Sequence, residues 1–104
     1  MRFAKLWALV GSGPGIAPQY DSYGPVERAM LSEEEASTVD KNLDKAGFAT
    51  MQESLLVKAA RDMIFTTLTV EFENGDEHKV KFAGGTMPQS VQEVIDLAMR
   101  FPQD

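Results

Sequence analysis

The sequence contains no cysteine, one histidine and one tryptophan. Without thiols the chain can form neither a disulfide framework nor a thiolate metal site, and such a composition fits a reducing compartment such as the cytoplasm. A single imidazole, that of His78, also disfavours a zinc site, because structural and catalytic zinc sites draw on several His or Cys ligands. We therefore expect no bound metal and no cofactor.

Basic residues are few, with ten Lys and Arg against sixteen Asp and Glu, for a net charge of −6. An acidic chain without a basic cluster disfavours nucleic acids and anionic membranes as partners. Long apolar runs are also missing. The run Leu6–Val10 follows Arg2 and Lys5 as in a signal peptide, but it is too short for the usual hydrophobic region of one and far too short to cross a membrane. We predict a strand there, and no membrane association.

The apolar residues that are present suffice for one core. The chain has 104 residues, of which 43% are hydrophobic, so we predict a single domain over residues 1–104. The first predicted strand, Phe3–Val10, is apolar on both faces, with Ala4, Leu6, Ala8 and Val10 on one and Phe3, Lys5, Trp7 and Leu9 on the other. A second strand is expected within Tyr20–Met30. Gly24-Pro25 interrupts it, which predicts an edge position or a bulge.

The most clearly marked helix follows Ser32. Ser32-x-x-Glu35 is a capping box, and Gly47 supplies a left-handed stop after which Phe48 can fold back. The apolar positions between them recur at helical spacing: Ala36, Val39, Leu43 and Ala46. A second possible box, Thr50-x-x-Glu53, predicts a further short helix with an apolar stripe of Leu55, Leu56, Ala59 and Ala60.

Residues 62–82 alternate with period two on both sides of Asn74-Gly75, which indicates a β-hairpin. A two-residue loop would bury lysines. A three-residue loop, Glu73-Asn74-Gly75, sets Leu68 beside Val80 and Val70 beside His78, with Gly75 in a left-handed bulge position. We predict the three-residue form, with a solvated outer face of Thr67, Thr69, Glu71, Lys79 and Lys81.

A last helix is predicted from Pro88, which suits a first helical turn. Its apolar stripe comprises Val91, Val94, Ile95, Ala98 and Phe101. Strands joined in adjacent pairs and separated by helices favour an α+β fold, a four-stranded antiparallel sheet with two to three helices packed on one face.

The stretch GSGPGIAPQY, residues 11–20, is the most distinctive loop. It does not fit a phosphate cradle, since Ile16 stands at the third glycine position and Pro14 removes an amide. His78 is expected to be a packed structural residue, and Glu33-Glu34-Glu35 to cap a helix rather than bind metal. Tyr and Trp are favoured interface anchors, so a Gly/Pro-rich loop beside Trp7, Tyr20 and Tyr23 predicts a contact surface for another protein.

The whole arrangement resembles the emfourins, small inhibitors of protealysin and other thermolysin-like zinc metalloproteases. The resemblance covers most of the chain and lies in RFAKLWALV with its Gly-rich loop, in the helix LSEEEASTVDKNLDKAGF, in Asp62-x-x-x-x-x-Leu68-Thr69-Val70 followed by Asn74-Gly75, His78 and Val80, and in Pro88-x-x-Val91. It implies a cytoplasmic, non-enzymatic protease inhibitor that blocks the substrate cleft with a loop or a sheet edge. We expect such an inhibitor to be monomeric when free.

The loop departs from the family, which usually has Gly-Gly followed by an aromatic residue at this point. Composition therefore selects the expected contacts with the protease: Gly13, Pro14, Gly15, Ile16, Pro18, Tyr20 and, in second rank, Tyr23. Two alternatives remain open. One is a regulator or adaptor domain that binds a protein without inhibiting it, and the other is a small enzyme that pairs His78 with a carboxylate.

Overall fold

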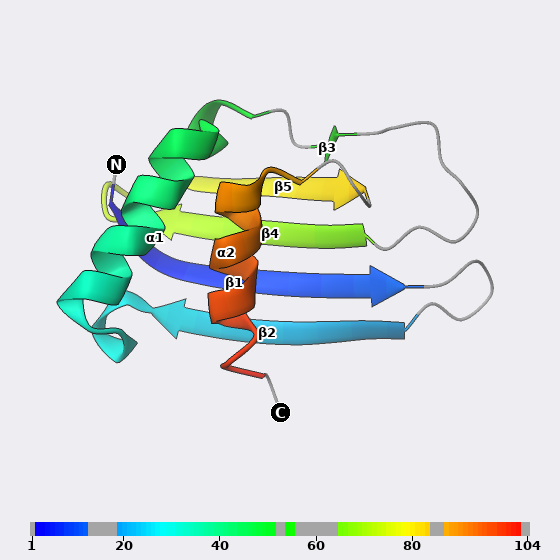
Figure 1. Cartoon of the computed structure of the whole chain (residues 1–104), viewed down its shortest axis with the longest axis horizontal. Helices are drawn as coiled ribbons and strands as arrows, with labels where there is room; N and C mark the ends of the chain where they lie inside the picture. The colour runs from blue at the N-terminus through cyan, green and yellow to red at the C-terminus, as the bar shows by residue number, and fades with distance from the viewer. Residues whose placement is uncertain (1, 13–18, 52–53, 56–64, 84–86, 103–104) are drawn as a thin grey trace.

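The computed structural model describes residues 2–12, 19–51, 54–55, 65–83 and 87–102 (Figure 1). The strands are β1 (Phe3–Ser12), β2 (Gln19–Glu27), β3 (Ser54–Leu55), β4 (Phe65–Phe72) and β5 (Glu77–Ala83). The α-helices are α1 (Glu33–Ala46) and α2 (Gln89–Ala98), and the short 3-10 helices are η1 (Arg28–Met30) and η2 (Phe48–Thr50).

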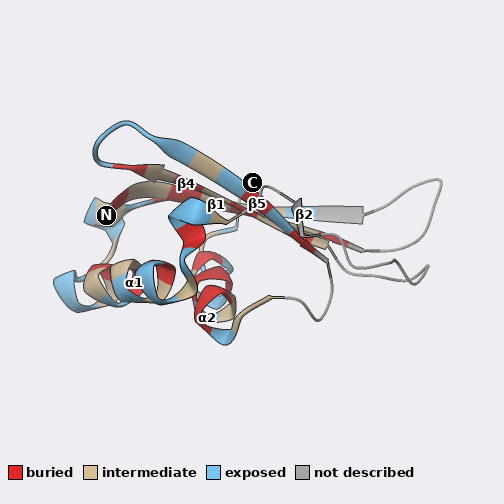
Figure 2. Cartoon of the chain, turned by 90° about the horizontal axis from the view of Figure 1, so that it is seen from above, coloured by how far each residue is buried: buried red, intermediate tan, exposed pale blue. Residues whose placement is uncertain are grey.

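The strands form one sheet in the order β2-β1-β4-β5-β3. The first four are antiparallel, and the two-residue β3 pairs in parallel with β5. Both α-helices lie against the same face of the sheet, and no helix of the described residues covers the other face, here called the open face (Figure 2). The α+β class and the four-stranded antiparallel sheet are therefore confirmed, with two α-helices in the described part of the chain.

The core lies between the helices and the sheet. Alternate residues of β4 are buried, which is the pattern of a strand covered on one side only. The largest fully buried side chains come from every layer: Phe3, Leu6, Val26, Phe48, Leu68, Val70, Val80, Phe82, Val91, Val94 and Ile95. The stripes predicted for both helices face this core, as Ala36, Val39 and Leu43 on α1 and Val91, Val94, Ile95 and Ala98 on α2 are buried.

The local signals at α1 act as predicted. The Ser32 hydroxyl oxygen accepts a hydrogen bond from the Glu35 amide at 3.1 Å, and the Ser32 amide donates to Glu35 Oε1 at 3.2 Å. Gly47 ends the helix with φ 66°, and Phe48 behind it is fully buried. At α2, Pro88 is the N-cap residue rather than part of the first turn.

The hairpin also has the predicted register. Leu68 pairs with Val80 and Val70 with His78, and the Phe72 amide donates to the Asp76 carbonyl at 2.7 Å, so the loop is Glu73-Asn74-Gly75. Gly75 takes φ 95°, the left-handed position that closes such a loop.

The prediction of a helix after Thr50 is wrong where the structure describes it. Ser54–Leu55 is a strand paired with Lys81 and Phe82. Glu53, Leu56, Ala59 and Ala60 of that prediction lie outside the described residues, as do residues 62–64 at the start of the predicted hairpin. The Thr50 hydroxyl donates backwards to the Gly47 carbonyl at 3.0 Å. It therefore stabilises the turn η2 instead of capping a new helix.

The face predicted for Phe3 is also wrong. Phe3 pairs with Phe72 and Lys5 pairs with Glu71, so β1 has one more residue than β4 between these two pairs. This bulge reverses the alternation of faces along β1 at Phe3. Phe3 is consequently buried with Leu6, and the Arg28 guanidinium lies 5.1 Å from its ring centre. The interruption predicted for β2 is confirmed, because β2 is an edge strand and its register with β1 shifts around Gly24-Pro25.

Candidate functional site

The predicted contact loop joins β1 to β2 at the end of the sheet far from α1, here called the free end (Figure 1). Residues 13–18, which include Gly13, Pro14, Gly15, Ile16 and Pro18, lie outside the described residues. Both ends of this segment are described: Ser12 pairs with Gln19, and Gly11 pairs with Tyr20. The antiparallel ladder therefore continues up to the segment and fixes the separation and direction of its two ends.

The two tyrosines differ in position. The backbone of Tyr20 belongs to β2 beside the loop. Tyr23 pairs with Ala8, and its side chain packs against the core. The C-terminal segment covers the edge there, since Tyr23 forms a bridge with Pro102 and the Gly24 amide donates to the Phe101 carbonyl at 2.8 Å. Tyr23 is thus a packed residue of the fold, and a contact with a partner stays a prediction for it.

The open face of the sheet carries a second surface. Directly opposed residues of antiparallel strands project to the same side, and two such rows lie next to the free end. One row runs Leu9, Thr67, Lys81 and the other Trp7, Thr69, Lys79. These six residues are called the open-face patch.

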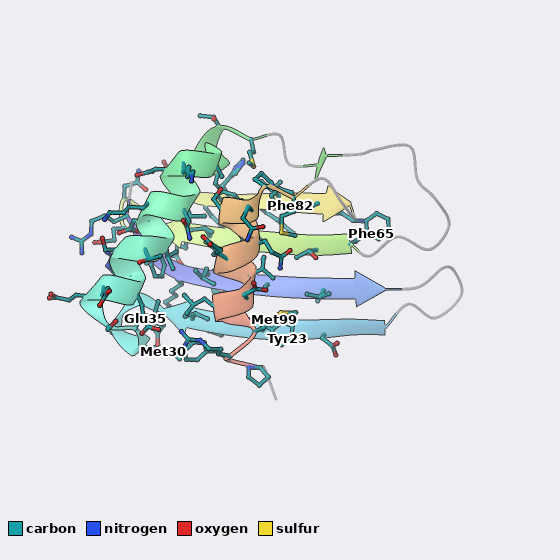
Figure 3. The ribbon with its side chains drawn as sticks, in the orientation of Figure 1. Tyr23, Met30, Glu35, Phe65, Phe82 and Met99 are labelled. Carbon is teal, nitrogen blue, oxygen red and sulfur yellow. The ribbon has the colours of Figure 1, made fainter. Side chains whose placement is uncertain are left out.

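The patch is apolar on β1 and basic on β5. Leu9 is 37% exposed. A hollow of about 220 Å³ is lined by five residues of the patch, Trp7, Leu9, Thr67, Thr69 and Lys79, and by Ala8, Ser22 and Tyr23. At its border the Lys81 ammonium lies 4.7 Å from the ring centre of Phe65, a distance suited to a cation–π contact. Phe65 itself stands at the free end (Figure 3).

Carboxylates on this face belong to the next row, away from the free end. There Lys5 opposes Glu71, which in turn opposes Glu77, and the Lys5 ammonium lies 3.9 Å from Glu27 on β2. The lysines of the two rows nearest the free end, Lys79 and Lys81 on β5, therefore have no carboxylate in the described part of their rows, and mixed charge lies farther from the free end.

The helical side has the opposite character. A hollow of about 320 Å³ between α1 and α2 is lined by Glu34, Glu35 and Glu93 over an apolar floor that includes Val39 and Leu97. The hollow on the helical side thus differs in charge from the hollow on the open face.

His78 has a structural environment. Its Nε2 lies 2.8 Å from the Met51 carbonyl oxygen, and because a carbonyl only accepts, the ring nitrogen donates. The ring packs edge-on against Phe48, with ring centres 5.3 Å apart. These two contacts account for a partly buried histidine between the sheet and η2, as the structural interpretation of the sequence expected.

Glu33, Glu34 and Glu35 form the first turn of α1, and Glu35 has a local role there. Glu35 completes the capping box and accepts a hydrogen bond from the Arg100 guanidinium at 2.6 Å. That bond, and then the bond from the Ser32 amide, hold the pKa of Glu35 below its ordinary value. Among the residues that the structure describes, no group of three or more His, Cys, Asp or Glu is placed to hold a metal ion.

The sequence signalled the open-face patch only in part. The alternation of β4 and β5 placed Thr67, Thr69, Lys79 and Lys81 outward, and the parity of β1 put Trp7 and Leu9 on the side away from Leu6. These patterns do not predict which face of the sheet the helices cover. The sequence alone therefore could not decide whether Trp7 is exposed or covered.

No helix among the described residues has the length and apolarity needed to span a membrane. Comparison with protein-family models, with curated proteins and with solved structures finds no match to this chain.

Proposed function

We propose that this protein inhibits a thermolysin-like zinc metalloprotease by placing the β1–β2 connection, or the adjoining edge of β2, in the substrate cleft. One observation carries the proposal: the ladder between β1 and β2 runs to Ser12 and Gln19 and fixes both ends of the segment 13–18 at the free end of the sheet. The resemblance to the emfourins supplies the class of protease.

A cleft that cleaves peptides must accept an extended chain, and a blocking segment competes best when little order is lost on binding. Here the segment leaves from paired strands, and its two prolines restrict the free chain. The helices pack behind the sheet and away from the free end (Figure 1), so the free end can approach a cleft without a clash from α1.

Such an inhibitor acts by occlusion. It needs no metal and no nucleophile of its own, because the segment excludes substrate from the zinc of the protease. The expected behaviour is stoichiometric inhibition that stops when the protease is saturated, with the inhibitor uncleaved at the end.

The test is a titration of a purified thermolysin-like protease with the wild-type protein, followed by cleavage of a fluorogenic peptide. A second variant replaces residues 13–18 by Asn-Gly, a pair that closes a two-residue hairpin between Ser12 and Gln19. We expect one-to-one inhibition by the wild type and a loss of at least roughly 100-fold in the variant, as for removal of an interface hot spot. Circular dichroism checks that the variant is folded.

Three results discriminate. Equal inhibition by both proteins would remove the loop from the mechanism. No inhibition by the wild type at large excess would overturn the proposed function. A tight complex with an uninhibited protease would favour the alternative of a non-inhibitory regulator.

A further inference from the structure

We infer that the open-face patch is a second contact surface of the inhibitor, and that it docks on a carboxylate-bearing rim of the protease beside the cleft. This inference rests on the proposed function and adds to it the chemistry of the surrounding partner surface. It follows from the position, the composition and the charge of the patch.

The first step is adjacency. Gly11 pairs with Tyr20 on one side and with Phe65 on the other, and Leu9 pairs with Thr67 in the next outward-facing row. The patch therefore begins one outward-facing row behind the ends of the proposed inhibitory segment. A partner held at that segment lies next to the patch as well.

The second step is size. A stable protein–protein interface covers roughly 800 Å² on each partner, contributed by about 20 to 30 residues. The segment 13–18 has six residues, so a tight complex must use neighbouring surface. The surfaces available next to the free end are the open side and the helical side of the sheet.

The third step is composition. Trp7 and Leu9 pair with Thr69 and Thr67, the positions of β4 that alternate with its buried ones, so the core does not require apolar side chains there. Trp7 is half-buried, and Leu9 is 37% exposed. An aromatic anchor ringed by hydroxyl-bearing and charged residues is the pattern of an interface centre with a polar rim. The hollow of about 220 Å³ beside Trp7 offers space for one apolar side chain of the partner.

The fourth step is charge, which selects the occupant. Lys79 and Lys81 lie in the same two rows as Trp7 and Leu9, and among the described residues of those rows there is no carboxylate. In a chain of net charge −6, most surfaces repel an acidic partner, whereas this one attracts it. The hollow between α1 and α2, lined by Glu34, Glu35 and Glu93, has the opposite preference.

The experiment compares Lys79→Glu/Lys81→Glu with a matched control, Lys41→Glu/Lys45→Glu, which makes the same charge change at exposed positions of α1. Inhibition constants and association rates are measured with the same purified protease from 20 to 300 mM salt, and circular dichroism confirms folding. We expect the open-face variant to inhibit about tenfold or more weakly at low salt, to associate more slowly and to lose most of the salt dependence. The control should stay within about twofold of the wild type.

A third variant, Trp7→Thr, tests the apolar anchor. It should dissociate faster from the protease with little change in the association rate, because short-range contacts act mainly on dissociation. If the wild type inhibits and the open-face variants inhibit equally well, the inference is overturned and the proposed function stands. If the wild type does not inhibit, both fall. If the α1 control is weakened as much as the open-face variant, the charge of the patch is not specific and the inference is overturned.

Discussion

The substitution Asp40→Asn tests the contact that joins β1, η1 and α1. The two Asp40 oxygens accept from the Arg28 guanidinium at 3.0 and 2.6 Å, and Oδ1 also accepts from the Phe3 amide at 3.1 Å. The Asp40 and Arg28 side chains are only 16% and 22% exposed. The Phe3 carbonyl accepts a further bond from Arg28 at 3.0 Å, so the cluster holds the first residue of the sheet against the helical layer.

The expected loss follows from burial. Hydrogen bonds to charged groups contribute about 1.5–3 kcal/mol, and removing one partner of a fully buried pair costs about 3–5 kcal/mol. Because this pair is partly exposed, we expect about 2 kcal/mol for Asp40→Asn, in which the side-chain shape is kept. The matched control is Glu73→Gln. Glu73 pairs with Arg2 at 3.1 Å, but the two side chains are 44% and 66% exposed, so the expected loss is below about 1 kcal/mol.

The pH dependence gives a second readout. Burial by itself raises the pKa of Asp40, but the hydrogen bonds from Arg28 and the Phe3 amide and the charge of Arg28 outweigh it, so the pKa lies below its ordinary 3.8. The unfolded state therefore binds the proton more readily. The stabilisation is complete well above pH 3.8 and is lost as the pH falls through the folded-state pKa. Asp40→Asn should flatten that acid limb of the stability profile.

The measurement is urea unfolding followed by circular dichroism at neutral pH and at steps down to about pH 2.5. The reasoning is refuted if Asp40→Asn is no more destabilising than Glu73→Gln at neutral pH. It is also refuted if the difference between wild type and Asp40→Asn stays constant through the acid range, because the carboxylate would then contribute nothing through its charge.

Two further pairs of substitutions separate structural roles by the same unfolding assay. Leu68→Ala should cost about 2–5 kcal/mol, since Leu68 is fully buried, whereas Leu9→Ala on the open face should cost below about 1 kcal/mol; equal costs would contradict the assignment of faces. Gly24 and Gly75 both have positive φ, 98° and 95°, but a Cβ at Gly24 would stand 2.7 Å from the Leu6 carbonyl oxygen while one at Gly75 meets nothing within 4 Å. Gly24→Ala should therefore cost at least about 1 kcal/mol more than Gly75→Ala, which bears only the backbone strain, and a reversed order would show that β1 and β2 separate without penalty.

Local chemistry made much of the fold predictable. The capping box at Ser32 and the left-handed stop at Gly47 act within a few residues, so the bounds of α1 followed from the sequence. The hairpin register followed from a parity argument in which only the three-residue loop buries Val70 and Val80 while it leaves Lys79 in water. In both cases the alternative structure is destabilised within a few residues: the ends of α1 would lose their capping contacts, and a two-residue hairpin loop would bury lysines.

The misplaced elements depend on contacts that are distant in sequence. Phe3 changes faces through a bulge against Phe72, which no pattern within β1 announces. Ser54 and Leu55 pair with β5, and the edge of β5 competes there with any helix that Thr50 would cap. The open-face patch was predictable in part. The alternation along its strands followed from the sequence, whereas its exposure depends on both helices packing on the opposite side of the sheet.

One face of the sheet is covered by the helices and the other is open. Substitutions on the open face can therefore test binding separately from the free energy of unfolding. Leu6 on β1, Leu68 on β4 and Val80 on β5 are fully buried under the helices. The neighbours of these residues along each strand project to the open face. Folding therefore does not require large apolar side chains on the open face, where Thr67 and Thr69 also lie. Trp7 and Leu9 are the large apolar side chains of the open-face patch, and their two rows also contain Lys79 and Lys81. If Trp7→Thr leaves the free energy of unfolding unchanged within about 0.5 kcal/mol, then the tryptophan is not retained for stability, and a binding role becomes the physical explanation for its presence. If the same change destabilises the protein as much as Leu68→Ala, then Trp7 belongs to the structural framework and the open face loses its anchor.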